Sequence, residues 1–296
     1  MLIALFFIYI LAIVSGYVPL VIWHGMGDSC CNPLSIGRII VDIKHMAPGI
    51  YVHSLQIGND IVEDTENGFF MEVNKQIEIA CNIIRNDTQL RNGYNAMGLS
   101  QGGQFLRAVA QRCPQPSMKI LLSVGGQHQG VFGFPRCNAD HSIFCELIRD
   151  SINLGVYSNF IQEHVVQAEY WHDSENEPLY IQKSNFLALI NHERDVGNLQ
   201  DKNNLQKLTL FILVMFTKDT MVEPKETEWF GFYAPGNTKK LIPLNESAIY
   251  LEDRLGLKEM NDAKKLRFIA CPSDHLEFSN EWFMENLMPY INGTYQ

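Results

Sequence analysis

The chain has 296 residues, of which 46% are hydrophobic and 19% are charged, a composition typical of a folded protein with a large core. Its formal net charge is -10 at pH 7, and it contains no run of Lys and Arg that could neutralise phosphates, so we expect no nucleic acid as a partner. The negative charge also provides no attraction to anionic lipid surfaces.

Residues 1–16, MLIALFFIYILAIVSG, have the pattern of a secretory signal peptide. They are apolar from Leu2 to Val14 and end in the small residues Ser15 and Gly16. This apolar run is shorter than the roughly 20 residues that span a bilayer, and no other segment is long enough, so we expect no stable transmembrane anchor. Because no Lys or Arg precedes Arg38, an uncleaved core strand or anchor is the alternative.

Strand and helix patterns alternate after residue 17. Short apolar, β-branched runs predict strands, and apolar residues at helical spacing predict helices. In chain order we expect strands at 17–23 and 51–57, a helix at 69–84, a strand at 94–99, a helix at 101–112, and strands at 119–124, 208–216 and 266–270. This alternation predicts an α/β fold with a mostly parallel central sheet covered by helices. Residues 17–296 are expected to form a single domain, with an aromatic-rich helical insertion at about 130–207.

Ser100 lies within AMGLSQGGQ, where a predicted strand ends and a predicted helix begins. A serine nucleophile at such a turn must expose its hydroxyl, and glycines such as Gly98 and Gly102 remove side chains that would collide across the bend. The amino end of the following helix also favours a developing oxyanion. We therefore interpret Ser100 as a candidate nucleophile; the alternative is an ordinary turn serine.

A serine nucleophile needs a histidine base and an acid that orients it. In this type of fold the order along the chain is serine, acid, histidine, and His275 follows the last predicted strand. The favoured acid is Asp219, because it follows the strand at 208–216 and so lies at the carboxyl edge of the sheet, where ligands of such folds bind. The alternatives considered for the acid are Asp195, Asp201 and Asp274.

An oxyanion hole requires two N–H donors, one from the residue after the nucleophile and one from the loop after an early strand. We expect the backbone N–H groups of Gln101 and Met26 to supply them. No zinc-binding spacing of His or Cys and no Gly-rich phosphate loop is found, so neither a metal nor a cofactor is expected.

Several longer blocks resemble one family, the lysosomal palmitoyl-protein thioesterases of the α/β-hydrolase fold. They are VIWHGMGDSCCNP, NAMGLSQGGQFLRA, GGQHQGVFGFPRC, QAEYWHD, EWFGFY, DRLGLKEM and DHLEF. Matched by motif, the resemblance implies Ser100 as nucleophile, Asp219 as acid and His275 as base, with Met26 and Gln101 as the oxyanion hole. It also implies a lysosomal location reached through the secretory pathway, with secretion as an alternative.

The resemblance further implies the disulfides Cys30–Cys31, Cys81–Cys113 and Cys137–Cys145, which leave Cys271 as the odd thiol among the seven cysteines. Three sequons are candidates for N-glycosylation, at Asn86, Asn245 and Asn292. They do not align clearly with the glycosylation sites of the family.

The expected reaction is hydrolysis of a thioester between a long-chain fatty acid such as palmitate and a cysteine of a protein or peptide. It would proceed through an acyl-Ser100 intermediate, and a cysteine thiol, with a pKa of about 8.5, leaves more easily than an alcohol. Two alternatives stay open. One is a secreted lipase or O-esterase, and the other is a non-catalytic binding protein of the α/β-hydrolase fold.

Overall fold

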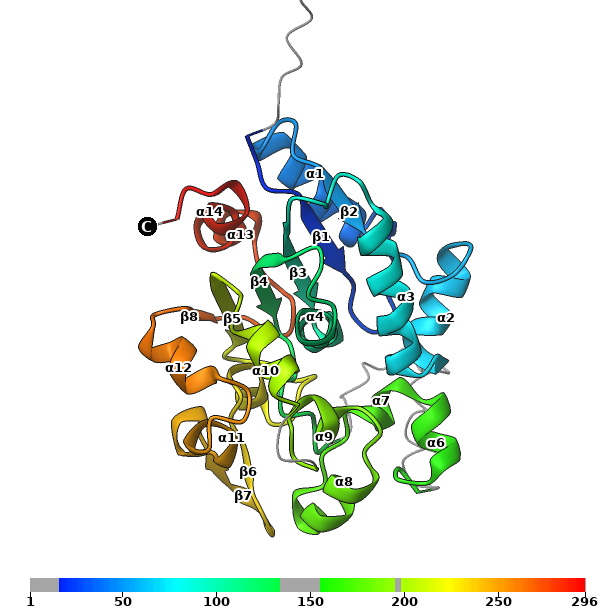
Figure 1. Ribbon diagram of the computed structural model, residues 1–296, viewed down its shortest axis with the longest axis vertical. Coiled ribbons are helices and arrows are strands. Elements are labelled where there is room, and N and C mark those ends of the chain that lie inside the picture. Colours follow the sequence, from blue (N-terminus) through cyan, green and yellow to red (C-terminus); the bar gives the residue numbers. More distant parts are fainter. Residues whose placement is uncertain (1–15, 134–154, 195–197, 296) are drawn as a thin grey trace, which may run out of the picture.

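The computed structural model describes residues 16–133, 155–194 and 198–295. Its centre is a six-stranded sheet of order β2-β1-β3-β4-β5-β8, in which all neighbouring strands are parallel. The strands are β1 (Leu20–Trp23), β2 (Val52–Ser54), β3 (Tyr94–Leu99), β4 (Met118–Val124), β5 (Leu210–Phe216) and β8 (Leu266–Cys271). The predicted α/β fold class is therefore confirmed (Figure 1).

Helices connect most of these strands. Those before β5 are α1 (Ile36–Met46), α2 (Ile61–Phe70), α3 (Val73–Asn86), α4 (Gln101–Arg112), α6 (Asn159–His164), α7 (Val166–Glu169), α8 (Glu177–Lys183), α9 (Leu187–Ile190) and α10 (Leu199–Leu205). Those after β5 are α11 (Ala248–Leu251), α12 (Leu257–Asp262), α13 (Asn280–Asn286) and α14 (Met288–Asn292). Short 3-10 helices occur as η1 (Ser174–Asn176), η2 (Lys225–Trp229) and η3 (Leu244–Glu246), and β6 (Phe232–Ala234) pairs with β7 (Asn237–Ile242) in an antiparallel hairpin.

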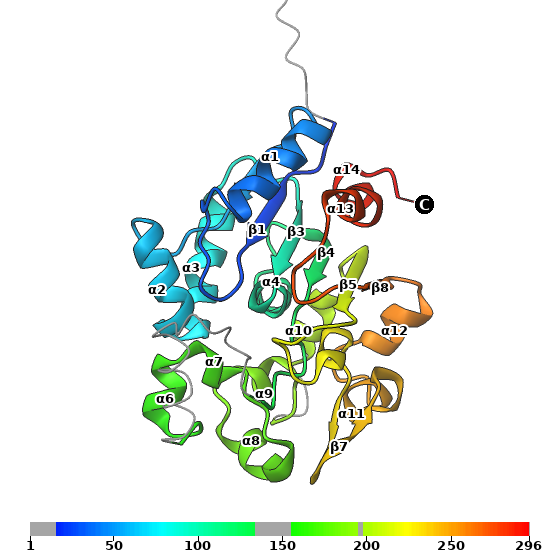
Figure 2. The same ribbon diagram turned by 180° about the vertical axis from the view of Figure 1, so that it is seen from behind.

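The sheet buries side chains on both of its faces, since successive residues of a strand point in opposite directions. In β1, Val21 and Trp23 belong to one buried cluster, and Leu20 and Ile22 belong to the other. Helices α3, α4 and α10 cover the first face, and α1, α13 and α14 cover the second, as the opposite views in Figures 1 and 2 show. Because both faces are covered, the strands read in the sequence as nearly continuous apolar runs.

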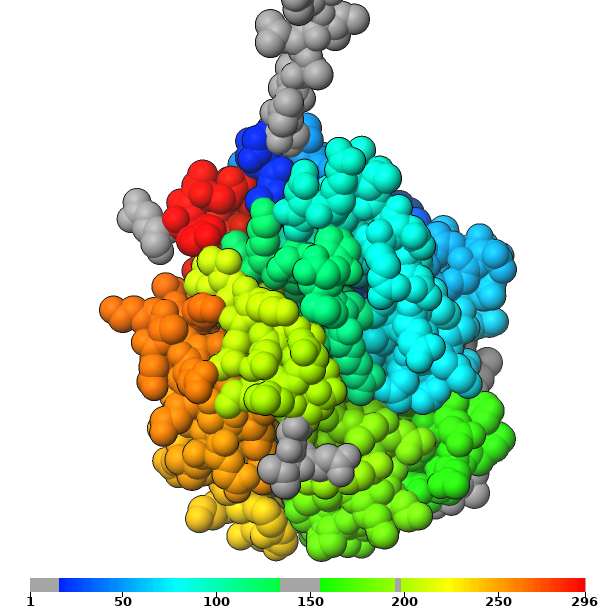
Figure 3. Space-filling view, in the orientation of Figure 1, coloured from blue at the N-terminus to red at the C-terminus, as the bar shows by residue number. Residues whose placement is uncertain are grey.

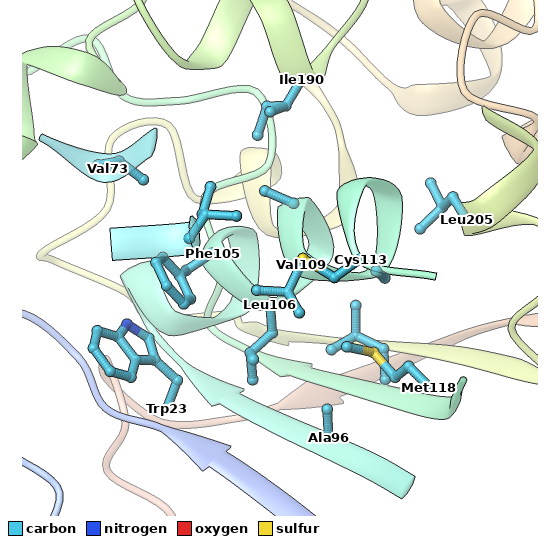
Figure 4. Close-up of a cluster of buried hydrophobic side chains, with 14 of the residues drawn as sticks. Trp23, Val73, Ala96, Phe105, Leu106, Val109, Cys113, Met118, Ile190 and Leu205 are labelled. Carbon is cyan, nitrogen blue, oxygen red and sulfur yellow. The ribbon is translucent and has the colours of Figure 1, made fainter. Parts of the chain in front are cut away.

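Helix α4 is buried along most of its length, with residues 101–111 all shielded from solvent. Phe105, Leu106 and Val109 of this helix face Trp23 and Ala96 of the sheet (Figure 4). The rings of Trp23 and Phe105 stack with their centroids 4.6 Å apart. This packing holds the turn between β3 and α4 firmly in place.

Helices α6 to α10 lie between β4 and β5 in the chain, in the segment where a helical insertion was expected. The part of the chain with α6 to α9 lies against α2 and α3 (Figure 3), and one contact is a 2.8 Å hydrogen bond from Val73 N–H to Glu169 Oε1. No helix within the described ranges is both long and apolar enough to cross a membrane.

Two predicted elements were wrong in their extent. The strand expected at 51–57 is shorter, because β2 covers only Val52–Ser54. The single helix expected at 69–84 is two helices, because α2 ends at Phe70, Met71 is extended, and α3 begins at Val73. Tertiary contacts explain the break, since Glu169 accepts a hydrogen bond from the Val73 N–H and Gln76 donates to the Met71 carbonyl oxygen. The β6–β7 hairpin was not predicted from the sequence.

Two of the three expected disulfides lie in the described ranges. The structure pairs Cys30 with Cys31 and Cys81 with Cys113, and the second pair joins α3 to the end of α4. Cys271 is a buried free thiol. The expected Cys137–Cys145 pair and the leader at 1–16, except for its last residue, lie outside the described residues.

Candidate active site

Ser100 occupies the sharp turn between β3 and α4. Its φ is 54° and its ψ is -125°, a backbone conformation that residues other than glycine rarely adopt. A Cβ on Gly98 would lie 2.2 Å from Gly102 O, and a Cβ on Gly102 would lie 2.5 Å from Trp23 O. Both positions therefore require glycine, for the reason that the sequence pattern suggested.

Ser100, His275 and Asp219 lie in one hydrogen-bonded row, although they come from three distant parts of the chain. His275 Nε2 is 2.9 Å from Ser100 Oγ, and His275 Nδ1 is 2.5 Å from Asp219 Oδ2. Because the carboxylate accepts, Nδ1 carries the proton and Nε2 is left to accept from the Ser100 hydroxyl. The arrangement matches the geometry needed for a base-activated nucleophile.

The side chain of Asp219 is fully buried and held at both oxygens. Oδ1 accepts hydrogen bonds from the N–H groups of Met221 (2.7 Å) and Val222 (2.8 Å), which leaves Oδ2 to face His275. Burial alone would raise the pKa of Asp219, but hydrogen bonds from His275 and Glu228 outweigh it, and the pKa is lowered. Asp219 is therefore ionised at neutral pH.

The two alternative acids within the described residues, Asp274 and Asp201, do not reach the imidazole ring of His275. Asp274 accepts hydrogen bonds from the backbone N–H groups of His275 (2.7 Å) and Thr220 (2.8 Å). It therefore joins the two loops at their backbones. Asp201 lies in α10, 4.0 Å from His192, and Asp195 lies outside the described residues.

The two expected oxyanion donors belong to residues close to Ser100. Met26 and Ser100 line the same pocket, and a Cβ on Gly25 would be only 3.2 Å from the Ser100 Cβ. Gln101 begins α4, so its N–H is free of helical hydrogen bonding. Its side chain is tied elsewhere: Nε2 donates to Gly68 O at 3.2 Å and Oε1 accepts from the Tyr170 hydroxyl at 3.4 Å.

The loop that carries Met26 is anchored by a buried carboxylate, that of Asp64. Asp64 accepts hydrogen bonds from the N–H groups of Cys30 (2.8 Å) and Ile57 (2.7 Å). Its Oδ2 is also 3.4 Å from Nε2 of His24, the residue that opens the loop. Sequence reasoning missed Asp64, because only the fold brings α2 beside this loop.

Ser100 and His275 open onto a pocket of about 470 Å³, within the range of roughly 300 to 1,000 Å³ usual for small-molecule sites. Apolar side chains form much of its wall, with Tyr170 and Trp171 coming from the segment between β4 and β5. The other apolar lining residues are Met26, Leu34, Ile39, Leu99, Val131, Met221, Val222, Leu276 and Phe278. Such a wall can hold an apolar chain next to the serine.

A further buried acid, Glu228 of η2, lies beside Asp219 and His275. Within the described ranges, these three side chains form the one group of His, Cys, Asp and Glu residues whose ligand atoms converge, all within 4.8 Å of one another. Both ring nitrogens of His275 already have hydrogen-bond partners in Asp219 and Ser100, so we assign no metal to this group. Glu228 lies in the matching block EWFGFY, but its position in the sequence predicted no role for it.

Comparisons with known proteins agree on one family. A family model described as palmitoyl protein thioesterase matches residues 19–275. Palmitoyl-protein thioesterase 1 of Caenorhabditis elegans is 49% identical over 271 residues, covering 92% of this chain and 90% of that protein. Palmitoyl-protein thioesterase 3 of Dictyostelium discoideum is 33% identical over 290 residues, covering 96% of this chain and 95% of that protein.

More distant proteins also match. Lysosomal thioesterase PPT2 of Homo sapiens is 26% identical over 261 residues, covering 87% of this chain and 81% of that protein. A solved structure of Paleococcus ferrophilus monoacylglycerol lipase aligns with a TM-score of 0.47 at 12% identity, covering 94% of this chain and 97% of that chain. From the family model and the two full-length relatives, this chain belongs to the palmitoyl protein thioesterase family.

Proposed function

We propose that this chain hydrolyses the thioester between a long-chain fatty acid, such as palmitate, and a cysteine of a protein or peptide. The observation that carries this proposal is the hydrogen-bonded row of Ser100, His275 and Asp219 at an apolar pocket, in a chain of this family. The three relatives matched by sequence are named as thioesterases, and two of them as palmitoyl-protein thioesterases.

In the first half-reaction, Ser100 Oγ forms a bond to the acyl carbonyl carbon while His275 Nε2 takes the hydroxyl proton. Asp219 holds the ring in the required tautomer and stabilises the imidazolium. The N–H groups of Met26 and Gln101 stabilise the negative carbonyl oxygen. The carbon–sulfur bond then breaks, and the cysteine sulfur leaves with the proton from His275.

In the second half-reaction, water replaces the thiol. His275 removes a proton from the water, and the resulting hydroxide attacks the acyl-Ser100 ester. Collapse of the second tetrahedral intermediate breaks the carbon–oxygen bond to Ser100, which regains its proton from His275. The products are a free fatty acid and a free cysteine thiol, and the enzyme is restored without any cofactor.

The pocket supports a long acyl chain as substrate. Burying an alkyl chain gains about 0.8 kcal/mol per methylene, so apolar contact can supply much of the binding energy. Tyr170, Trp171, Val131, Phe278 and Leu276 provide apolar surface in the same pocket as Ser100.

Hydrolysis of matched palmitoyl thioester and O-ester peptides by the wild type and by Ser100→Ala tests the proposal. We expect the wild type to prefer the thioester and the Ser100→Ala variant to be inactive. In the wild type, palmitate bound to Ser100 should be detectable by mass spectrometry. Ser123→Ala is the matched control, because the buried Ser123 hydroxyl contacts His128 Nε2 at 2.8 Å and cannot reach the pocket.

Three results would count against it. Equal activity of Ser100→Ala would remove Ser100 as nucleophile. Preference of the wild type for the O-ester would favour a lipase or O-esterase, and a folded wild type that cleaves neither substrate would favour a binding protein.

We also propose a signal peptide at 1–16, one hydrolase domain at 17–296 with its helical insertion at about 130–207, and a lysosomal location. The naming of one relative as a lysosomal thioesterase supports the location. Glycosylation at Asn86, Asn245 and Asn292 is consistent with passage through the secretory pathway. Asn86 and Asn245 are exposed, and Asn292 is partly exposed.

A further inference from the structure

The Glu228 carboxyl group packs directly against the acid and base of the candidate active site. Glu228 belongs to η2, which follows β5 in the chain. Its side chain is 0% exposed, and Oε1 is 4.0 Å from His275 Nδ1. The Asp219 side chain is also 0% exposed, so two buried carboxyl groups meet beside one imidazole ring.

The two oxygens of Glu228 have different surroundings. Oε2 accepts a hydrogen bond from the Phe216 N–H at 2.8 Å. Oε1 accepts from no N–H or O–H group in the part of the chain that the structure describes, and it faces Asp219. Two ionised carboxylates in this position would repel each other in a poorly solvated space, and one proton between them removes that repulsion.

The proton belongs on Glu228 rather than on Asp219. Asp219 accepts from the N–H groups of Met221 and Val222 and from His275, and several donors favour the ionised form of a carboxyl. Burial, the hydrogen bond to Asp219 and the charge of Asp219 together raise the pKa of Glu228 well above its usual value. Glu228 is therefore the member of this pair of carboxyl groups that holds the proton.

We propose that Glu228 is a positioning residue, a neutral donor that hydrogen-bonds to Asp219 and limits the negative charge facing His275. This inference rests on the proposed function. With one carboxylate charge instead of two beside the ring, the neutral imidazole that must accept the Ser100 proton is favoured over the imidazolium.

The other charged groups around this cluster do not replace Glu228. Asp274 binds the His275 backbone N–H and acts on Asp219 only through its charge. Glu226 lies on the same short helix as Glu228, and its charge helps to keep Glu228 protonated. The hydrogen bond between Glu228 and Asp219 is thus the contact to perturb.

The test compares pH profiles of kcat/KM for the wild type, Glu228→Gln and Glu228→Leu. The amide of Gln can donate to Asp219 and accept from the Phe216 N–H, so we expect this variant to keep the acidic limb of the wild-type profile. Leu cannot donate, so we expect its acidic limb to move up by about 0.5 to 1 pH unit. The ratio of kcat/KM at pH 4.5 to its plateau value would then be about three- to tenfold lower in Glu228→Leu than in the wild type.

Glu169→Gln and Glu169→Leu are the matched controls. Glu169 is also a buried carboxyl that accepts from a backbone N–H, that of Val73, but it is not in contact with His275 or Asp219. Both variants should keep the acidic limb even if their plateau falls. A purely structural role for Glu228 would likewise lower the plateau of Glu228→Leu without moving its limb, and that result would overturn the inference.

A second readout separates this inference from the identity of the substrate. The rate at which a fluorophosphonate labels Ser100 depends on His275 but needs no thioester. If the wild type is labelled but cleaves no palmitoyl thioester, the proposed substrate fails while the pH profile of labelling still tests Glu228. If Ser100 is not labelled at all, the proposed function and this inference fail together.

The protonation state can also be measured without Glu228→Leu, in case that variant does not fold. The infrared difference between the wild type and Glu228→Gln at pH 7 should contain the carbonyl stretch of a protonated carboxyl. A carboxylate band in its place would overturn the inference.

Discussion

Gly102→Ala is expected to reduce kcat about a hundredfold while changing KM little. A Cβ at this position would lie 2.5 Å from Trp23 O and 2.8 Å from His24 O. Both are backbone atoms, which cannot rotate away. Ordinary Cβ contacts begin at 3.4 Å, so α4 and the end of β1 must separate by about 0.9 Å, the difference between 3.4 and 2.5 Å.

That separation acts directly on the candidate site. His24 leads into Gly25 and Met26, and Gly102 follows Ser100 by two residues, so the Met26 N–H moves away from the reacting oxygen. Misplacement by about 1 Å costs about 10²-fold in rate, and loss of one oxyanion donor costs about 10²- to 10³-fold. The strain should also lower the free energy of unfolding by about 1 to 3 kcal/mol.

Gly68→Ala is the matched control, because its Cβ would face the neighbouring residues His24 and Gln101. The distances there, 3.5 Å to His24 Cε1 and 3.7 Å to Gln101 Nε2, are ordinary contacts. Gly68 lies within α2, so alanine should raise the free energy of unfolding by about 0.5 to 1 kcal/mol and leave kcat unchanged.

The assay is the steady-state hydrolysis of a palmitoyl thioester peptide, with denaturant unfolding measured in parallel. If Gly102→Ala keeps kcat within about threefold of the wild type, the close approach of α4 and β1 does not set the oxyanion geometry, and the reasoning is refuted.

Three other changes have definite expected results. Asp219→Asn should lower kcat about 10⁴-fold. The Met221 and Val222 N–H groups hold the amide oxygen, so the NH₂ group faces His275 and imposes the wrong tautomer on its ring. A loss of kcat below tenfold in the same assay would contradict this. Replacing both Cys81 and Cys113 by Ala should lower the free energy of unfolding by about 3 to 4 kcal/mol, as measured by unfolding in guanidinium. An unchanged free energy would show that the Cys81–Cys113 disulfide does not constrain the unfolded chain. Burial raises the pKa of Glu169 in the folded protein well above its usual value. In the wild type, protonated Glu169 therefore contributes its full stabilisation below the pKa that Glu169 has in the unfolded chain, and this contribution is lost as the pH rises towards the folded-state pKa. The Gln side chain of Glu169→Gln stays neutral at every pH. The melting temperature of this variant should therefore rise relative to that of the wild type between pH 4.5 and pH 7.5. A difference in melting temperature that does not change with pH would argue against a buried neutral acid.

The secondary structure around Ser100 could be predicted because local sequence determines it. β3 and α4 have the predicted bounds, since an apolar run, two glycines at a bend and a helical pattern follow one another without interruption. The helix expected at 69–84 failed for the opposite reason. Its apolar spacing continues through Met71, but contacts with residues far along the chain bend the backbone there.

The prediction of Ser100, Asp219 and His275 used chain order and position relative to strands, and the structure brings the three side chains into contact. Asp64 and Glu228 could not be found in this way. Their importance lies in burial and in the groups that they face. These depend on how α2 packs against the loop of Cys30, and on how η2 packs against the end of β5 and against His275.

The amino-acid sequence alone determined the α/β class, the turn at Ser100 and the candidates for the hydrogen-bonded row, because periodicity, glycine placement and strand order are local or topological properties. Only the tertiary structure decided which carboxylate faces His275, what lines the pocket, and that a second buried acid lies beside Asp219. Distances and solvent exclusion set the electrostatics of these groups, and both arise only when segments that are far apart in the sequence pack together.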